Sequence, residues 1–183
     1  MLSRKRIGIF FIFMGLFTLS FWIGSMSEPT EEDAQAFMEE FEELIDDIDA
    51  FGIFSHNTLL SLIMFIPGFG VGWGLFSAWS TGWGLAAIAL TTPEIAQLMS
   101  GNPLFSIAIL YVTPFGLMEL VAYSIATSRS YILIWMIIKK IDLRTAIRGT
   151  GIEIGILVGL LLIGGIIEDA MIKMAEEHGF DFG

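Results

Sequence analysis

The feature that most limits how this chain can fold is an apolar run from Ile7 to Met26, directly preceded by a basic triplet at residues 4–6. About 18 apolar residues are enough to span roughly 30 Å of hydrocarbon as a helix. A cleaved signal peptide is the alternative, because small residues lie near the end of the run, but the run is long for such a segment. We therefore predict a retained membrane helix over residues 7–26, with a cytoplasmic N-terminus.

The composition extends this prediction to the whole chain. Hydrophobic residues make up 55% and charged residues 16% of the 183 positions, whereas a soluble domain has about 45–50% and about 25%. The mean hydropathy is +0.75. We predict one all-α membrane domain over residues 1–183, a polytopic transmembrane helix bundle in the cell membrane.

Charge and metal-ligand content exclude several classes of protein. The chain has no cysteine, which excludes disulfides and cysteine-ligated metals. His56 and His178 lie far apart in sequence, which argues against a histidine-based metal site. The net charge of −11 argues against nucleic acid, which is bound through Lys and Arg, and against electrostatic docking on anionic lipid.

A strongly acidic segment follows the first apolar run. Residues 28–49 hold eleven acids and no base, while apolar residues recur at spacings of three and four from Ala34 to Ile48. This spacing is typical of one apolar helix face. We predict an amphipathic helix over residues 30–51, outside the membrane. It either packs on its own membrane domain or forms a docking surface for a basic partner or a cation.

Two further apolar segments carry breaks. The span predicted at residues 57–79 contains Gly70, Gly72 and Gly74, which allow close helix approach. The segment at residues 82–113 is interrupted near Pro93 and again at residues 101–103, so we predict a broken third helix. Broken helices occur at transporter sites and also as packing kinks.

The last two predicted spans are residues 114–138 and 150–174. The loop between them is rich in Lys and Arg, which favours a cytoplasmic position. About five crossings then place the C-terminus outside. The final span begins with the stripe Gly151, Gly155 and Gly159, for which we predict a helix–helix contact.

Ionisable residues inside apolar segments are costly and usually mark the functional part of a membrane protein. Counting along the predicted helices places one polar cluster at the outer edge of the membrane and Arg129 near its middle. For Arg129 the sequence leaves three partners open: Glu94, backbone carbonyls of the broken helix, or a water pocket. These groups either join helices, form a substrate or ion path, or bind a partner. The predicted cluster comprises His56, Asn57, Glu119, Glu168 and Asp169.

Signatures of enzyme chemistry are absent from the sequence. We find no zinc-protease motif, no nucleophile elbow and no phosphate-binding loop. The sequence therefore predicts no catalytic residues, no metal ligands and no cofactor.

Three short motifs occur in a recognisable order. Residues 114–122 read PFGLMELVA, residues 166–170 read IIEDA, and Asn57 opens an apolar segment that ends at Thr81 and Gly82. Together with the first helix and the acidic helix, they resemble the stage II sporulation protein M family of polytopic membrane proteins. The family motif is Pro-His-Gly-x-x-Glu-Leu-x-Ala, so Phe115 replaces its histidine, and His56 replaces the first of a frequent pair of asparagines.

The resemblance implies a non-catalytic membrane scaffold, since the sporulation member anchors peptidoglycan-degrading partners. Relatives also occur in cells without peptidoglycan, so the partner's identity does not carry over. The leading hypothesis is a scaffold or accessory subunit that binds protein partners in the membrane or on its outer side. The alternative is a small transporter or permease subunit with a polar site around Glu119 and Arg129.

Overall fold

The computed structural model describes residues 3–45, 48–102 and 104–177, so His178 lies outside the described residues. The described residues form helices and no strand, which confirms the all-α class. The helices are α1 (Arg4–Ser25), α2 (Glu31–Ile45), α3 (Ala50–Ile63), α4 (Phe69–Thr91), α5 (Pro93–Gly101), α6 (Phe105–Val112), α7 (Pro114–Ile138) and α8 (Arg144–Glu177).

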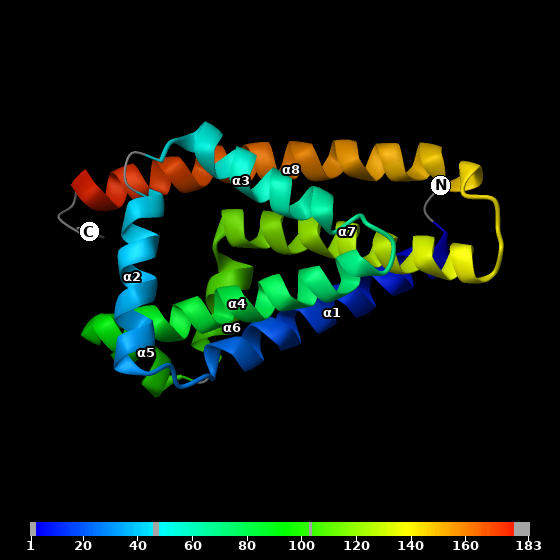
Figure 1. The fold of residues 1–183 in the computed structure, drawn as a ribbon. Coiled ribbons are helices and arrows are strands. Elements are labelled where there is room, and N and C mark those ends of the chain that lie inside the picture. Colours follow the sequence, from blue (N-terminus) through cyan, green and yellow to red (C-terminus); the bar gives the residue numbers. More distant parts are fainter. Residues whose placement is uncertain (1–2, 46–47, 103, 178–183) are drawn as a thin grey trace.

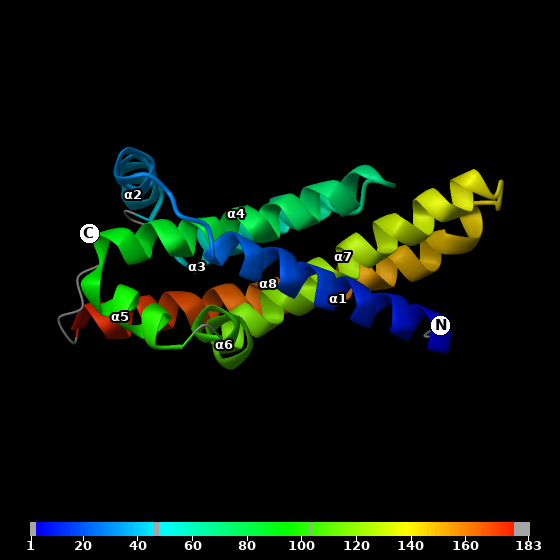
Figure 2. The same ribbon diagram turned by 90° about the horizontal axis from the view of Figure 1, so that it is seen from below.

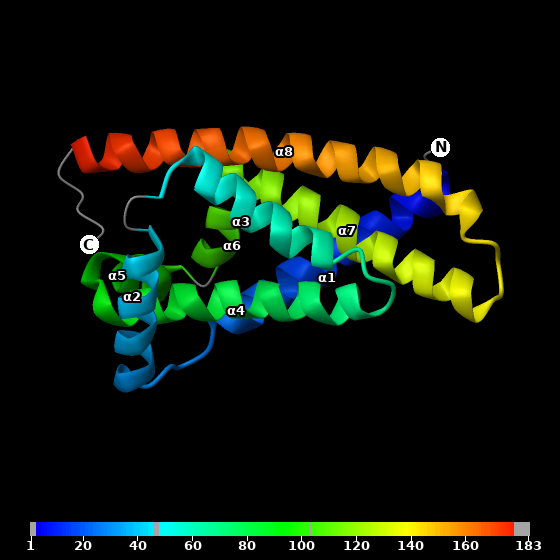
Figure 3. The same cartoon turned by 45° about the horizontal axis from the view of Figure 1, so that its top comes forward.

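The helices form an elongated bundle with two distinct ends (Figure 1). The start of α1 and the α7–α8 loop lie at one end, which we name the loop end. Helices α2 and α5 and the last turns of α8 lie at the other, which we name the α2 end. Helices α7 and α8 run antiparallel along the length of the bundle, and α1 packs most extensively on α4 (Figure 3).

Three helices in the described part of the chain are long and apolar enough to cross a membrane. They are Arg4–Ser25, Pro114–Ile138 and Arg144–Met174. The bent pair Ile95–Gly101 and Phe105–Val112 adds a fourth crossing if it counts as one span. By length and composition, the structure therefore provides three or four spans where the sequence predicted about five.

The predicted span at residues 57–79 is wrong as a single helix. Helix α3 ends at Ile63, and the chain reverses direction before α4 begins at Phe69 (Figure 3). Pro67 lacks the amide donor that a continuous helix needs, and Gly68 has a φ of 78°, a left-handed conformation that favours glycine. At 14 residues, α3 is roughly 21 Å long, too short to cross roughly 30 Å of hydrocarbon.

The predicted break in residues 82–113 is present, but the first part of that segment belongs to α4. Helix α4 continues to Thr91, and Pro93 opens α5 because proline suits the first turn of a helix. The helices on either side of residues 102–104 are bent by 109° relative to each other. The segment therefore forms the end of one helix and two short ones.

The acidic helix α2 lies across the α2 end, crosswise to the long helices (Figure 2). The hydroxyl of Thr30 accepts a hydrogen bond from the Asp33 amide at 3.1 Å, which caps its start. Its apolar face packs on α4, where Phe37 makes an edge-to-face contact with Trp83, and Ala34 on α2 is buried. The predicted helix over residues 30–51 is shorter in the structure. Helix α2 ends at Ile45, and Ala50 already belongs to α3.

Helices α1 and α4 approach each other closely through glycines for which the sequence analysis predicted no packing role. A Cβ on Gly24 would collide with the backbone of Trp79, and one on Gly82 would collide with the backbone of Phe21. In lipid, small residues let helices gain van der Waals contact at short range. This crossing fixes α1 against the bundle.

Candidate functional site

Helix α7 carries a run of small hydroxyl residues around Arg129, and three of the buried hydroxyls donate within the helix. Those of Ser124 and Thr127 donate to the carbonyls of Leu120 and Tyr123, at 2.6 and 2.8 Å. Bonds of this kind leave a hydroxyl satisfied without help from another helix. The small side chains also leave room for a long arginine between helices.

Arg129 is held by Glu153 of α8. The Arg129 Nε donates to Oε2 at 2.6 Å, and a terminal nitrogen donates to Oε1 at 2.5 Å. The two side chains are 10% and 13% exposed. A bidentate pair of this kind fixes geometry as well as charge. The sequence analysis named Glu94 as one possible partner of Arg129. The side chain of Glu94 lies outside the described part of the chain.

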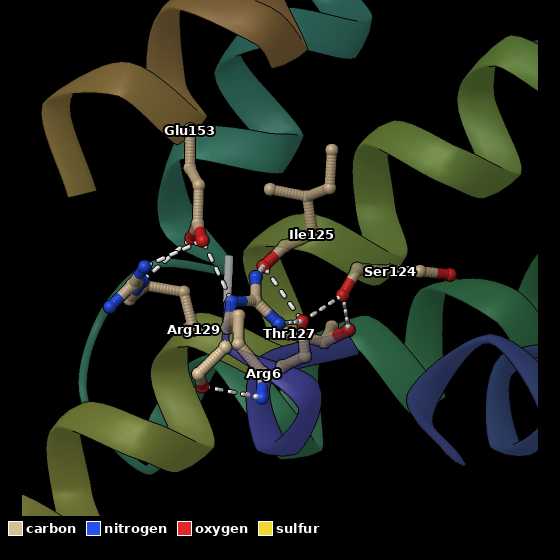
Figure 4. A network of polar contacts seen from close by, with 8 residues as sticks. Arg6, Ser124, Ile125, Thr127, Arg129 and Glu153 are labelled. Atoms are coloured by element: carbon tan, nitrogen blue, oxygen red, sulfur yellow. Dashed lines mark hydrogen bonds and ion pairs between the residues drawn. The ribbon is translucent and has the colours of Figure 1, made fainter. Parts of the chain in front are cut away.

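A second arginine reaches the same carboxylate from α1 (Figure 4). The Arg6 Nε donates to Glu153 Oε1 at 2.7 Å. Its two terminal nitrogens donate to Ser128 Oγ at 2.9 Å and to the Ile125 carbonyl oxygen at 3.3 Å. Two guanidinium groups and one carboxylate therefore tie α1, α7 and α8 together, toward the loop end of the bundle.

The turn between α3 and α4 is attached to the same part of α7. The hydroxyl of Ser130, which is fully buried, donates to the Ile66 carbonyl at 2.6 Å. A Cβ on Gly68 would lie 3.2 Å from the Ile134 side chain. The reversal of the chain at residues 64–68 therefore sits against α7, next to the Arg129 pair.

A second polar group lies nearer the α2 end. The Asn57 Nδ2 of α3 donates to Glu119 Oε1 of α7 at 2.6 Å. Glu168 of α8 and Tyr123 lie close enough to interact electrostatically with the Glu119 carboxyl. The Glu168 Oε2 is buried and has no hydrogen-bond partner among the described residues. Three of the five residues predicted to form one cluster therefore come together.

Comparison with known protein families identifies one family for this chain. The family model described as stage II sporulation protein M matches residues 8–170, which is most of the chain. The chain belongs to the stage II sporulation protein M family. No curated protein and no solved structure matches it significantly. The matched residues include Asn57 and Glu119, which are joined by a hydrogen bond.

In this stage II sporulation protein M family member, the other two predicted members of the cluster form no hydrogen bond with the three that come together, among the described residues. His56 is exposed on α3. Asp169 accepts a hydrogen bond from Lys173 one turn along α8, at 2.9 Å. A helix turns by about 100° per residue, so neighbours in sequence face different directions. Counting depth along the helices did not take this rotation into account.

The predicted glycine contacts divide into two groups. A Cβ on Gly70 would collide with the backbone of Met64, and one on Gly74 would collide with Thr127 of α7. In contrast, no other described part of the chain lies within 4 Å of a Cβ placed on the remaining four. For those four the predicted contact is not made within the described chain: Gly72, Gly151, Gly155 and Gly159.

Neither of two surface hollows near the α2 end includes Arg129 or Glu119. One, of about 360 Å³, is lined by Gln35, Met38, Glu39, Thr91 and Thr92. The other, of about 240 Å³, is lined by Ser25, Met26, Met99, Asn102 and Ser106. Among the described residues, no three His, Asp or Glu side chains gather closely enough to hold a metal ion.

Sequence reasoning missed Glu153 and Arg6 as parts of the Arg129 site. One signal was available for Glu153. Arg129 and Glu153 are equally far in sequence from Ile141, which lies in the α7–α8 loop. Residues related in this way lie opposite each other in an antiparallel helix pair. For Arg6 no such signal exists, because its partners are more than 100 positions away in sequence.

Proposed function

We propose that this chain is a non-catalytic scaffold or accessory subunit of a membrane protein complex. One observation carries the proposal: Arg129, the intramembrane base that a permease site would present to its substrate, is 8% exposed and bound to Glu153. A transport site needs a charged or polar group that substrate can reach from one side. A scaffold needs only a packed core, and a closed ion pair suits it.

The acidic face of α2 supports the choice of a protein partner. The helix uses its apolar face on α4, so its carboxylates point away from the bundle. Six of them are exposed and form no ion pair with a described residue. Charge of one sign on a surface favours a partner of the opposite sign. These residues are Glu31, Glu32, Asp33, Glu39, Glu40 and Glu43.

We further propose a multi-pass orientation with a cytoplasmic N-terminus and an external C-terminus. The first residues of α1, the α7–α8 loop and the first residues of α8 share the loop end and carry six exposed bases. The positive-inside tendency assigns such an end to the cytoplasm. The acidic α2 then faces outside, where a docked partner would meet it.

Purification from native membranes in mild detergent, followed by mass spectrometry, tests the proposal. We expect a stable partner to co-purify with the tagged full-length chain. Changing Glu32, Glu39 and Glu43 together to Gln should release that partner without lowering the melting temperature. Asp142→Asn is the matched control, because it removes a carboxylate at the opposite end. Purification of the chain alone, with substrate flux in liposomes, would show that the scaffold proposal is wrong.

One observation favours the permease alternative. The Glu168 Oε2 is buried without a partner among the described residues, beside Glu119. Most buried polar atoms have a hydrogen-bond partner, so an unpaired oxygen is a place where a proton or a cation can bind. In a permease, Glu168→Gln would abolish flux in liposomes while leaving partner binding unchanged. In a scaffold, the unmodified chain shows no flux in liposomes, and Glu168→Gln leaves the co-purified complex intact.

A further inference from the structure

The α7–α8 loop and the first turn of α8 form an exposed basic segment at the loop end. Four bases lie between residues 139 and 148, and all are exposed. None pairs with a carboxylate among the described residues. The one acid nearby, Asp142, accepts a hydrogen bond from the backbone amide of Arg144 at 2.9 Å. The four bases are Lys139, Lys140, Arg144 and Arg148.

Large aliphatic side chains alternate with these bases. Ile138 is 68% exposed and Ile147 is 67% exposed, while Ile141 and Leu143 are each 40% exposed. A loop that faces water would bury such side chains or replace them. A segment at the boundary between lipid headgroups and acyl chains needs both kinds of residue, since its apolar side chains enter the hydrocarbon and its bases reach the phosphates.

In the sequence alone, the net charge of −11 argued against docking on anionic lipid. The structure removes this objection, because the charges are separated along the bundle. The acids of α2 lie at the opposite end from the α7–α8 loop (Figure 1). Helix α8 alone has 34 residues and is roughly 51 Å long. Screening in physiological salt acts over about 8 Å. The acids of α2 are therefore too far away to cancel the positive charge of the loop end.

The backbone at Lys140 gives a second reason to assign a role to this charge. Lys140 follows the last turn of α7 with a φ of 55°, a left-handed conformation. Glycine is the usual residue where a helix ends in this way, because other L-residues are strained there. A lysine at this position adds a positive charge to the loop, although its backbone conformation is less favourable than it would be for glycine.

We propose that residues 138–148 form an interfacial anchor that binds the headgroup phosphates of anionic phospholipids in the leaflet facing the loop end. The bases of residues 4 and 5 lie at the same end and add to the positive charge. The proposal does not depend on the identity of a protein partner, nor on which side of the membrane this leaflet lies.

The test uses the purified full-length chain in mild detergent, with melting followed by tryptophan fluorescence. Dioleoyl phosphatidylglycerol should raise the melting temperature in a saturable titration, whereas dioleoyl phosphatidylcholine should raise it much less. Inorganic phosphate at the same concentration should have no effect. Equal stabilisation by the two lipids, or equal stabilisation by inorganic phosphate, would overturn the proposal.

Single substitutions of the bases distinguish an effect on lipid binding from an effect on folding stability. Each of Lys139→Gln, Arg144→Gln and Arg148→Gln should weaken phosphatidylglycerol binding about five-fold. Lys140→Gly should raise the melting temperature without lipid and still weaken lipid binding. Lys173→Gln, which removes a base near the α2 end, is the control and should leave lipid binding unchanged.

Salt provides a test that needs no variant. Because the proposed contact is electrostatic, the affinity of the unmodified chain for phosphatidylglycerol should fall as sodium chloride is raised. An affinity that does not change with salt would overturn the proposal, as would full phosphatidylglycerol binding by the variants with a lost base.

Discussion

Glu153 is the carboxylate that two largely buried arginines share. It accepts hydrogen bonds from Arg6 and Arg129, which come from different helices. The side chains of both arginines are 10% exposed and that of Glu153 is 13% exposed. Removing the Glu153 carboxylate leaves two guanidinium groups without their anion, whereas removing one arginine leaves the other still paired with Glu153. The two kinds of change should therefore differ in cost.

We expect Glu153→Gln to destabilise the chain by about 3–5 kcal/mol, the usual cost of breaking a buried ion pair from one side. Arg129→Gln should cost less, about 1–3 kcal/mol, because Arg6 still neutralises Glu153. Melting in detergent measures both. A larger loss for Arg129→Gln than for Glu153→Gln would contradict the shared-anion arrangement.

Glu119 has a structural partner before any functional role is considered. Its bond from Asn57 at 2.6 Å joins α3 to α7. Glu119→Gln keeps an oxygen that can accept this bond, and Glu119→Ala removes it and leaves the Asn57 amide unpaired. The expected cost of the alanine variant is about 1–3 kcal/mol, while the glutamine variant should melt close to the unmodified chain. If Glu119→Gln abolishes partner binding at an unchanged melting temperature, the charge itself is functional.

At the scale of whole helices, glycine has two different uses in this chain. Gly82 faces the backbone of α1 at the α1–α4 crossing, while Gly155 faces open space on α8. The four-residue glycine spacing in α8 is as regular as in any packed stripe, yet no described helix packs against it. Spacing alone therefore does not tell which helix a stripe contacts.

Alanine substitution distinguishes the two uses. Gly82→Ala should destabilise the chain by about 1–3 kcal/mol, because its methyl group meets backbone that cannot move aside easily. Gly155→Ala should leave the melting temperature unchanged or raise it, since alanine favours helix by up to about 1 kcal/mol. Loss of stability in Gly155→Ala would show that α8 packs on a further helix, for example in an oligomer.

At the scale of the whole molecule, charge separates the two ends of the bundle. The absence of cysteine makes this separation measurable, since one introduced thiol gives an unambiguous label. Thr145 is exposed at the loop end and Glu32 is exposed on α2. We predict that a membrane-impermeant thiol reagent added to intact cells labels Glu32→Cys and leaves Thr145→Cys unlabelled. Labelling of Thr145→Cys alone would reverse the proposed orientation.

The sequence by itself determined the helical class and the position of two of the long helices, α1 and α7. The predicted spans 7–26 and 114–138 compare with Arg4–Ser25 and Pro114–Ile138. These features follow from local properties: the length of an apolar run, a proline at a helix start and bases at its end. Asn57 and Glu119 were also named in advance, because polar residues in apolar segments are conspicuous.

Only the tertiary structure decided how the chain reversal packs and which polar groups meet. The reversal at residues 64–68 is held against α7 by the Ser130 hydroxyl, which donates to the Ile66 carbonyl across 64 positions. The meeting of Arg6 with Glu153 spans 147 positions and needs α1 to lie against α7, which itself packs on α8. Hydrophobic periodicity reports which face of a helix is apolar, but it carries no information about the neighbour that this face will contact.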